Sequence, residues 1–175
     1  MNLKVGILTI SDKGSRGERE DRSGPALQAM LSGIKAEVAQ YKIVPDEKEI
    51  ISQVLVDWSE LGIHLILTTG GTGFSPRDNT PEATLAVLEK SAPGISEAIR
   101  FYGLQKTPRA MLSRAVAGIR KQTLIVNLPG SEKGARESLE AIIDVLPHAI
   151  ETVCGLASEC AAGRNEERGT RNDKR

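Results

Sequence analysis

The strongest chemical signal in the sequence is a glycine-rich segment with an acid close behind it. Residues 67–84 read LTTGGTGFSPRDNTPEAT. Glycines let the backbone approach a ligand and adopt positive φ, and successive N–H groups can then hold an anion. The segment has neither the lysine of a P-loop nor the GxGxxG spacing of a dinucleotide fold. It predicts a phosphate-binding loop with little charge of its own, and the alternative is a plain tight turn. The predicted binding residues are Thr69, Gly70, Gly71, Thr72, Gly73 and Ser75, with Thr68 as a further hydroxyl donor.

Two aspartates could supply the missing positive charge by holding a metal ion. Asp78 follows the glycine-rich segment and Asp46 follows an apolar run. A carboxylate repels a phosphate unless a cation lies between them, and Mg²⁺ is usually bound by one or two carboxylates together with phosphate oxygens and waters. Asp46 and Asp78 are therefore the predicted catalytic and metal-binding residues of a metal-assisted phosphoryl or nucleotidyl transfer. Helix capping is the alternative: Asp46 could cap a helix from Glu47, while Thr80 before Pro81 is a better cap than Asp78.

Other polar residues could meet the same ligand. An arginine beside a serine offers a permanent cation and a hydroxyl for phosphate, and the N-terminus of a helix binds anions readily. Each has a structural alternative: a turn, a helix surface or a cap. His64 lies in an apolar run and indicates packing rather than catalysis, and His148 lies far along the chain from the other polar clusters. The additional candidates for phosphate or substrate binding are Ser11, Asp12, Ser113, Arg114, Pro129, Gly130 and Ser131.

Alternating strand and helix patterns position these candidates. The sequence predicts strands at 3–10, 38–44, 63–69 and 123–128, the second at an edge and the third central. The predicted helices span 23–32 with Ser23 as cap, 47–61, 80–90, 95–103 and 132–162, the last divided or kinked at Pro147. Residues 11–22 are predicted as a loop, and 107–120 as a mixture of loop and helix. Such alternation predicts an α/β fold with an open, largely parallel sheet. Ligands bind such sheets at the carboxyl ends of the strands, where the polar segments should converge.

The composition is that of one ordinary globular domain of 175 residues. Because 23 basic and 23 acidic residues cancel, nothing indicates binding to nucleic acid or to a membrane surface. No apolar run approaches the roughly 20 residues of a membrane helix. The two cysteines, six residues apart, do not suggest a disulfide framework, which favours a reducing, cytoplasmic setting. The domain is expected to span 1–162, with 163–175 as a mobile charged tail that has no apolar residue to bury.

Four blocks of the sequence resemble one known family. They are LTISDKGSRGEREDRSGP at 8–25, IVPDE at 43–47, TTGGTGFSPRDNTPEAT at 68–84 and AMLSRAVAGIRKQTLIVNLPGS at 110–131. Together they are similar to the molybdopterin adenylyltransferases of molybdenum-cofactor biosynthesis, the MogA-type enzymes. The resemblance spans roughly residues 3–160 and implies a three-layer α/β/α sandwich with a mostly parallel sheet.

The resemblance also implies an activity. Members of the family use ATP and Mg²⁺ to adenylylate the terminal phosphate of molybdopterin, releasing pyrophosphate, and they are commonly homotrimers. A MoeA-type protein then inserts molybdate. The family's essential acids fall on Asp46 and Asp78 of this sequence. A non-catalytic molybdopterin carrier or scaffold is the alternative. Molybdate insertion is disfavoured, because the family members that catalyse it are much longer chains.

Overall fold

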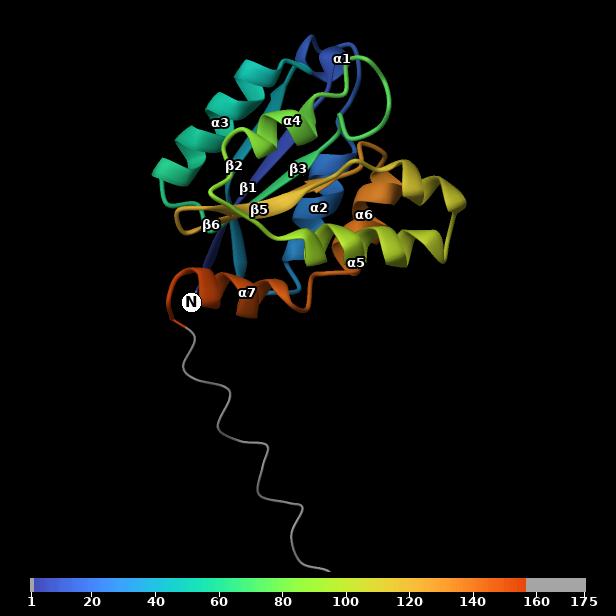
Figure 1. The fold of residues 1–175 in the computed structure, drawn as a ribbon. Helices are drawn as coiled ribbons and strands as arrows, with labels where there is room; N and C mark the ends of the chain where they lie inside the picture. The colour runs from blue at the N-terminus through green and yellow to red at the C-terminus, as the bar shows by residue number, and fades with distance from the viewer. Residues whose placement is uncertain (1, 157–175) are drawn as a thin grey trace, which may run out of the picture.

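The computed structural model describes residues 2–156, in which six strands form a single sheet (Figure 1). The strand order is β2-β1-β3-β6-β5-β4. The first four strands of this order are mutually parallel, while β5 and β4 continue the sheet with antiparallel pairing. The predicted mostly parallel sheet is therefore confirmed. The strands are β1 (Leu3–Ile10), β2 (Ala36–Val44), β3 (Leu65–Thr69), β4 (Lys90–Ser91), β5 (Ala117–Arg120) and β6 (Thr123–Leu128).

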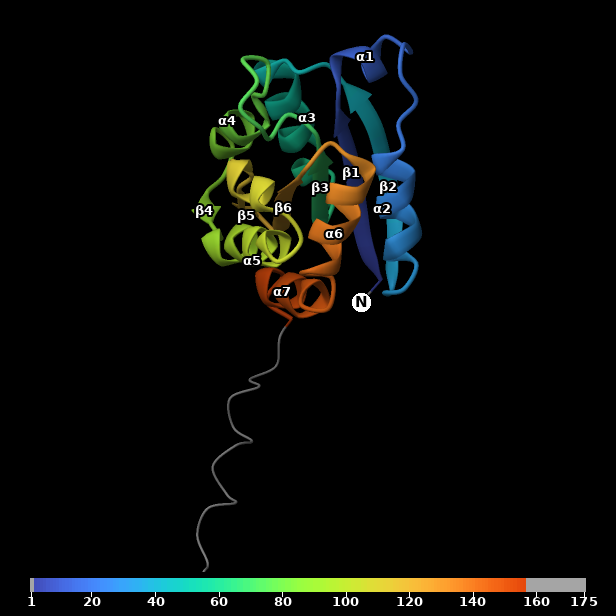
Figure 2. The same ribbon diagram turned by 90° about the vertical axis from the view of Figure 1, so that its right-hand side faces the viewer.

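Helices cover both faces of the sheet and complete the three layers. On one face, α2 (Ser23–Leu31), α5 (Pro93–Leu104), α6 (Glu132–Glu140) and α7 (Leu146–Val153) share a hydrophobic core with the strands. On the other face, α3 (Lys48–Glu60) and α4 (Thr80–Leu85) build a second core. Figure 2 shows α2 and α6 in front of the strands. Successive residues of a strand point to opposite faces, so Ile7 belongs to the first core and Leu8 to the second.

The predicted strands are present, but several predicted segments differ from the structure. The predicted loop at 11–22 begins with a short helix, α1 (Asp12–Ser15), and the helix predicted at 80–90 ends at Leu85. The ambiguous segment at 107–120 holds a 3-10 helix, η1 (Pro108–Leu112), and strand β5. That strand was missed because it owes its extended form to hairpin pairing with β6, through a turn in which Lys121 has φ +52°. The last predicted helix is divided, as expected, with Pro147 in the first turn of α7.

Three predicted helix caps are wrong, because those side chains make other contacts. The backbone N–H groups of Ser23 and Gly24 donate to the carboxylate of Asp21, which satisfies the start of α2. Asp46 does not cap α3, whose N-cap is Glu47 without a side-chain hydrogen bond. Thr80 is the first residue of α4, whose N-cap is Asn79, and the Thr80 hydroxyl donates to the Gly70 carbonyl oxygen. The predicted cap at Ser131 is confirmed, since its Oγ accepts the Gly134 N–H at 3.1 Å.

Some expectations concern parts of the chain that lie outside residues 2–156. These are the end of the predicted helix to 162, Cys160, the end of the domain and the charged tail at 163–175. Cys154 is a free, half-buried cysteine. No helix within the described range has the length and apolar character needed to cross a bilayer.

Candidate active site

The polar segments predicted to converge do meet at the carboxyl ends of the parallel strands. The Ser11 N–H donates to the Val44 carbonyl oxygen at 2.9 Å, which joins the ends of β1 and β2. The Gly70 N–H donates to the Leu128 carbonyl oxygen at 3.1 Å, which joins the ends of β3 and β6. The Thr69 hydroxyl donates to the Pro129 carbonyl oxygen at 2.7 Å. The four strand ends therefore form one continuous rim.

The glycines of the glycine-rich loop, residues 70–79, are required by close packing at this rim. Gly70 has φ +107° and Gly71 has φ +63°, a region of backbone conformation that favours glycine. A Cβ on Gly70 would overlap the Ile10 carbonyl oxygen, and one on Gly71 would overlap the Thr80 hydroxyl. A Cβ on Gly73 would lie 2.9 Å from Asp78 Oδ2. The plain tight turn does not explain such packing, because a simple turn needs no close approach of the end of β1 and the start of α4.

Asp46 and Asp12 bind each other's backbone across the ends of β1 and β2. The Asp12 N–H donates to Asp46 Oδ2 at 2.9 Å, and the Asp46 N–H donates to Asp12 Oδ1 at 3.1 Å. Burial raises the pKa of Asp46, and the nearby charges of Asp12 and Asp78 raise it further. By contrast, the Arg77 guanidinium donates two hydrogen bonds to Asp12 and lowers the pKa of that carboxyl. Asp46 is thus a carboxylate short of positive charge, whereas Asp12 already has a cation.

Asp78 is held in a turn at the base of the glycine-rich loop. Its Oδ2 accepts the Ser75 N–H at 3.0 Å, and its own N–H donates to the Ser75 carbonyl oxygen at 2.9 Å. Ser75 itself is exposed. The capping role is therefore absent for Asp78 as well as for Asp46.

Two cavities meet at the glycine-rich loop and Asp78. One, of about 490 Å³, lies against α5 and η1; the other, of about 750 Å³, lies beside the segment after α1. Gly71, Asp78, Gly130 and Ser131 line both. Of the remaining predicted residues, Thr72, Gly73, Ser113 and Pro129 line the first cavity, and Ser11, Asp46, Thr69 and Gly70 line the second.

A few predicted residues lie outside the linings of these two cavities. Asp12 is paired with Arg77, Ser75 supports the turn at Asp78, and the Arg114 guanidinium binds the glycine-rich loop itself. Thr68 is buried and accepts a hydrogen bond from Asn127 at 2.9 Å. These residues support the segments that form the site, and they do not line the two cavities.

Sequence reasoning missed several polar residues of the cavity walls. Arg100 and Arg109 line the smaller cavity, and Arg19 and Asp21 line the larger one. The Asp21 carboxylate accepts hydrogen bonds from the hydroxyls of Thr9 and Tyr41, which closes the segment at 19–23 over the sheet. Arg100 and Arg109 lie outside the motifs quoted above, and Arg19 and Asp21 lie in the block at 8–25, but only the fold shows that these side chains line a cavity.

Both histidines lie apart from the cavities, as expected. His64 Nδ1 accepts the Lys4 N–H at 2.9 Å, and burial lowers the pKa of this imidazole. His148 is exposed on α7.

The two site acids suit a Mg²⁺ ion that arrives with its ligand. Residues 2–156 contain no cluster of three or more His, Cys, Asp or Glu side chains placed to hold a metal ion. Within this range, one carboxylate oxygen of Asp46 and one of Asp78 accept no hydrogen bond, and both residues line the larger cavity. Mg²⁺ typically takes one or two carboxylates and completes its shell with waters and phosphate oxygens. The pair therefore fits such an ion when a phosphate ligand is present.

Comparison with known proteins assigns the family. A family model described as a probable molybdopterin binding domain matches residues 6–148. The chain belongs to this family. The resemblance noted in the sequence, and with it the fold expected of the molybdopterin-binding family, is confirmed.

Similar proteins span bacteria and a eukaryote. The crystal structure of the molybdopterin biosynthesis enzyme MoaB from Thermus thermophilus is 57% identical in sequence with a TM-score of 0.84, covering 87% of this chain and 97% of that one. The molybdopterin adenylyltransferase of Escherichia coli K12 is 44% identical over 155 residues, 85% of this chain and 80% of the relative. Gephyrin of Dictyostelium discoideum is 47% identical over 83% of this chain, which spans only 22% of gephyrin's length.

Proposed function

We propose that this protein is a molybdopterin adenylyltransferase, which transfers the adenylyl group of ATP to the terminal phosphate of molybdopterin and releases pyrophosphate. The observation that carries the proposal is the meeting of two cavities at one glycine-rich loop and one aspartate. A transfer between two phosphate-bearing substrates needs two binding spaces that join where the reacting phosphates meet. Relatives named molybdopterin adenylyltransferase support the same activity.

For this reaction the protein mainly has to position the phosphates and neutralise their negative charge. A phosphate oxyanion is already a nucleophile, so the proposal needs no general base and neither histidine takes part. Mg²⁺, when bound, would neutralise charge that develops on the phosphates. Asp46 and Asp78 would hold this ion from two loops. The Gly70 N–H is already bound to Leu128, so the backbone amides of Gly71–Gly73 and the start of α6 at Ser131 would orient the phosphate oxygens.

Replacing Asp78 tests the proposal. Asp78→Asn keeps the size of the side chain and removes its charge, and pyrophosphate release should fall by at least about 100-fold, within the range found when a group that stabilises transition-state charge is removed. Asp57→Asn, on the exposed face of α3, is the matched control and should turn over like the wild type. Near-wild-type turnover of Asp78→Asn would contradict the assignment.

A carrier or scaffold without turnover is the second candidate. Incubating the purified protein with ATP, Mg²⁺ and molybdopterin separates the two candidates. Pyrophosphate release in step with adenylyl-molybdopterin supports the enzyme. Retention of molybdopterin without pyrophosphate release supports the carrier.

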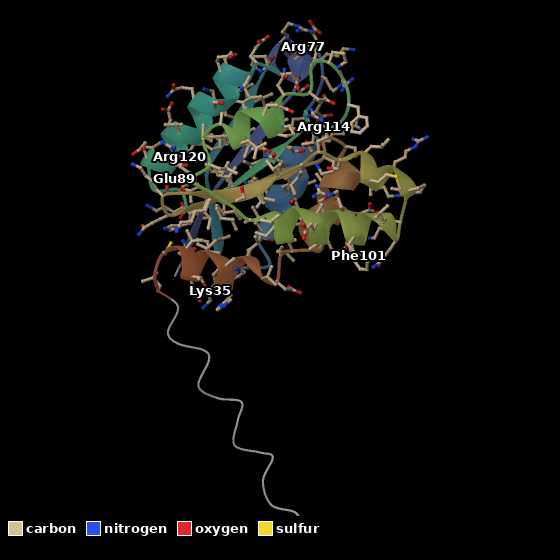
Figure 3. The ribbon with its side chains drawn as sticks, in the orientation of Figure 1. Lys35, Arg77, Glu89, Phe101, Arg114 and Arg120 are labelled. Carbon is tan, nitrogen blue, oxygen red and sulfur yellow. The ribbon has the colours of Figure 1, made fainter. Side chains whose placement is uncertain are left out.

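We also propose that the chain is a cytoplasmic homotrimer that hands its product to a MoeA-type partner. Large apolar side chains on α5 and η1 support assembly, because Phe101 and Met111 are 70% and 61% exposed (Figure 3 labels Phe101). Light scattering should give a mass three times that of the 18.8 kDa chain, and Phe101→Asp should lower it. An unchanged mass in the variant would exclude this surface as the contact.

A further inference from the structure

Arg114 binds the glycine-rich loop at several points. Its backbone N–H donates to the Thr72 carbonyl oxygen at 2.9 Å, and its Nε donates to the Gly73 carbonyl oxygen at 2.7 Å. Its Nη2 donates to the Asp78 carbonyl oxygen at 2.6 Å. Its Nη1 pairs with Glu82 of α4. One planar guanidinium therefore binds both ends of the segment between Gly73 and Asp78.

The tip of this segment has weaker support. Residues 74–77 are exposed, and the ion pairs of Arg77 with Asp12 and Glu47 involve side chains that are 52%, 29% and 46% exposed. Exposed ion pairs typically contribute about 0–1 kcal/mol. Within the loop, Ser75 binds the Asp78 carboxylate, and the contacts of Arg114 at the base of the loop join this turn to the rest of the fold.

The same contacts direct Arg114 away from the substrate spaces. All three guanidinium nitrogens donate to protein oxygens, and the residue is absent from the linings of both cavities that meet at Asp78. Glu82 also neutralises the charge of Arg114, which weakens its attraction for a phosphate. This arrangement suits a residue that holds the loop better than one that binds an anion.

We propose that Arg114 is a positioning residue whose guanidinium, held by Glu82, sets the place of the Asp78 carboxylate. This inference rests on the proposed function, in which Asp78 holds Mg²⁺. Lysine cannot replace the arginine fully, because an ammonium group lacks the planar fork that reaches two carbonyl oxygens at once.

The experiment compares Arg114→Lys with a matched control, Arg120→Lys. Arg120, also half-buried, donates to the Val87 carbonyl oxygen and pairs with Glu60, at the other end of β5 from Arg114 (Figure 3). We expect Arg114→Lys to weaken Mn²⁺ binding, measured by electron paramagnetic resonance with α,β-methylene-ATP present, by about tenfold and to lower kcat by at least tenfold. ATP binding measured without divalent metal should stay within twofold of the wild type. Arg120→Lys should leave all three quantities unchanged.

A double-mutant cycle separates positioning from direct binding. If Arg114 acts through Asp78, adding Arg114→Lys to Asp78→Asn should lower kcat no further than Asp78→Asn alone. A tenfold loss of metal-free ATP binding in Arg114→Lys, with Mn²⁺ binding unchanged, would overturn the inference in favour of a phosphate ligand. Glu82→Gln gives a second, milder test and should shift Mn²⁺ binding in the same direction, so unchanged Mn²⁺ binding in both variants would also overturn it.

The two proposals can fail separately. If Asp78→Asn keeps wild-type turnover, the proposed function of Asp78 fails. If Asp78→Asn is inactive while Arg114→Lys behaves as the wild type, only the positioning role of Arg114 fails.

Discussion

Gly71 offers the sharpest test of how packing builds the site. Its φ of +63° places it in the left-handed region, and a Cβ there would overlap the Thr80 hydroxyl and lie 3.0 Å from Asp46 Oδ1. Thr80 is fully buried, and its hydroxyl donates to the Gly70 carbonyl oxygen at 2.8 Å. Gly71→Ala should therefore strain the backbone, displace a buried hydrogen bond and crowd a proposed metal ligand in one step.

The expected loss of stability has two parts. The left-handed conformation costs an alanine roughly 1–2 kcal/mol. Loss of the hydrogen bond to a buried carbonyl adds about 1–3 kcal/mol. The free energy of unfolding should thus fall by about 2–5 kcal/mol. For a chain of 150–250 residues this lowers Tm by roughly 4–20 °C.

Gly62→Ala is the matched control, because it isolates the backbone term. Gly62 has φ +73°, and a Cβ there would meet nothing within 4 Å. Its stability loss should stay near roughly 1–2 kcal/mol, with turnover unchanged. Urea unfolding and a pyrophosphate-release assay on both variants measure the difference. Equal stability losses, with full activity in Gly71→Ala, would refute the steric reasoning.

Three further predictions follow from buried or paired side chains. Asp46→Asn should raise the free energy of unfolding at pH 7, because the raised pKa means that the charged form is disfavoured in the folded state. This gain in stability should decrease as the pH falls through the raised pKa of folded Asp46, and it should be absent below 3.8, the ordinary pKa of the residue. Urea unfolding at low pH measures it, and a gain that persists there would contradict the explanation. Asn127→Leu should lower the free energy of unfolding by roughly 2–4 kcal/mol, because the buried amide joins β6 to two threonine hydroxyls and to the Val116 N–H; a loss below about 1 kcal/mol in urea unfolding would contradict this. Arg77→Gln should change the free energy of unfolding by less than about 1 kcal/mol. It should nevertheless raise the pKa of Asp12 toward 3.8, which NMR of the carboxyl group measures. An unchanged pKa would contradict the pairing. The stability that this ion pair gives is present above 3.8 and is lost as the pH falls through the depressed pKa of Asp12, so the variant and the wild type should converge in acid.

Local sequence patterns were enough for much of the fold. The apolar runs that became β1, β3 and β6 are buried on both faces, so their composition alone identifies central strands. Strand β5 has only four residues, AGIR, and it is extended because β6 pairs with it. No local pattern could show that.

The candidate site divides in the same way. The need for glycine in the GGTG motif was readable, because few other residues allow such close approach of the backbone. The metal-binding role of the acids at 46 and 78 stays a prediction. The contacts of Asp46 and Arg114 were not readable, since each has a partner far away in the sequence: Asp12 and Glu82. The contact of Thr80 with Gly70 lies within the motif, but it depends on how the loop folds back onto α4. From neighbouring residues alone, the sequence suggested helix caps at Asp46 and Thr80 and a phosphate ligand at Arg114.

The sequence by itself determined the alternation of strands and helices, the convergence of polar segments at one edge of the sheet and the family. Only the tertiary structure decided which side chains line the two cavities and which bind the loops without facing the cavities. The physical reason is that apolar periodicity, and with it the succession of strands and helices along the chain, is a local property of the sequence. The partner of a guanidinium or a buried hydroxyl, in contrast, depends on how distant segments pack together.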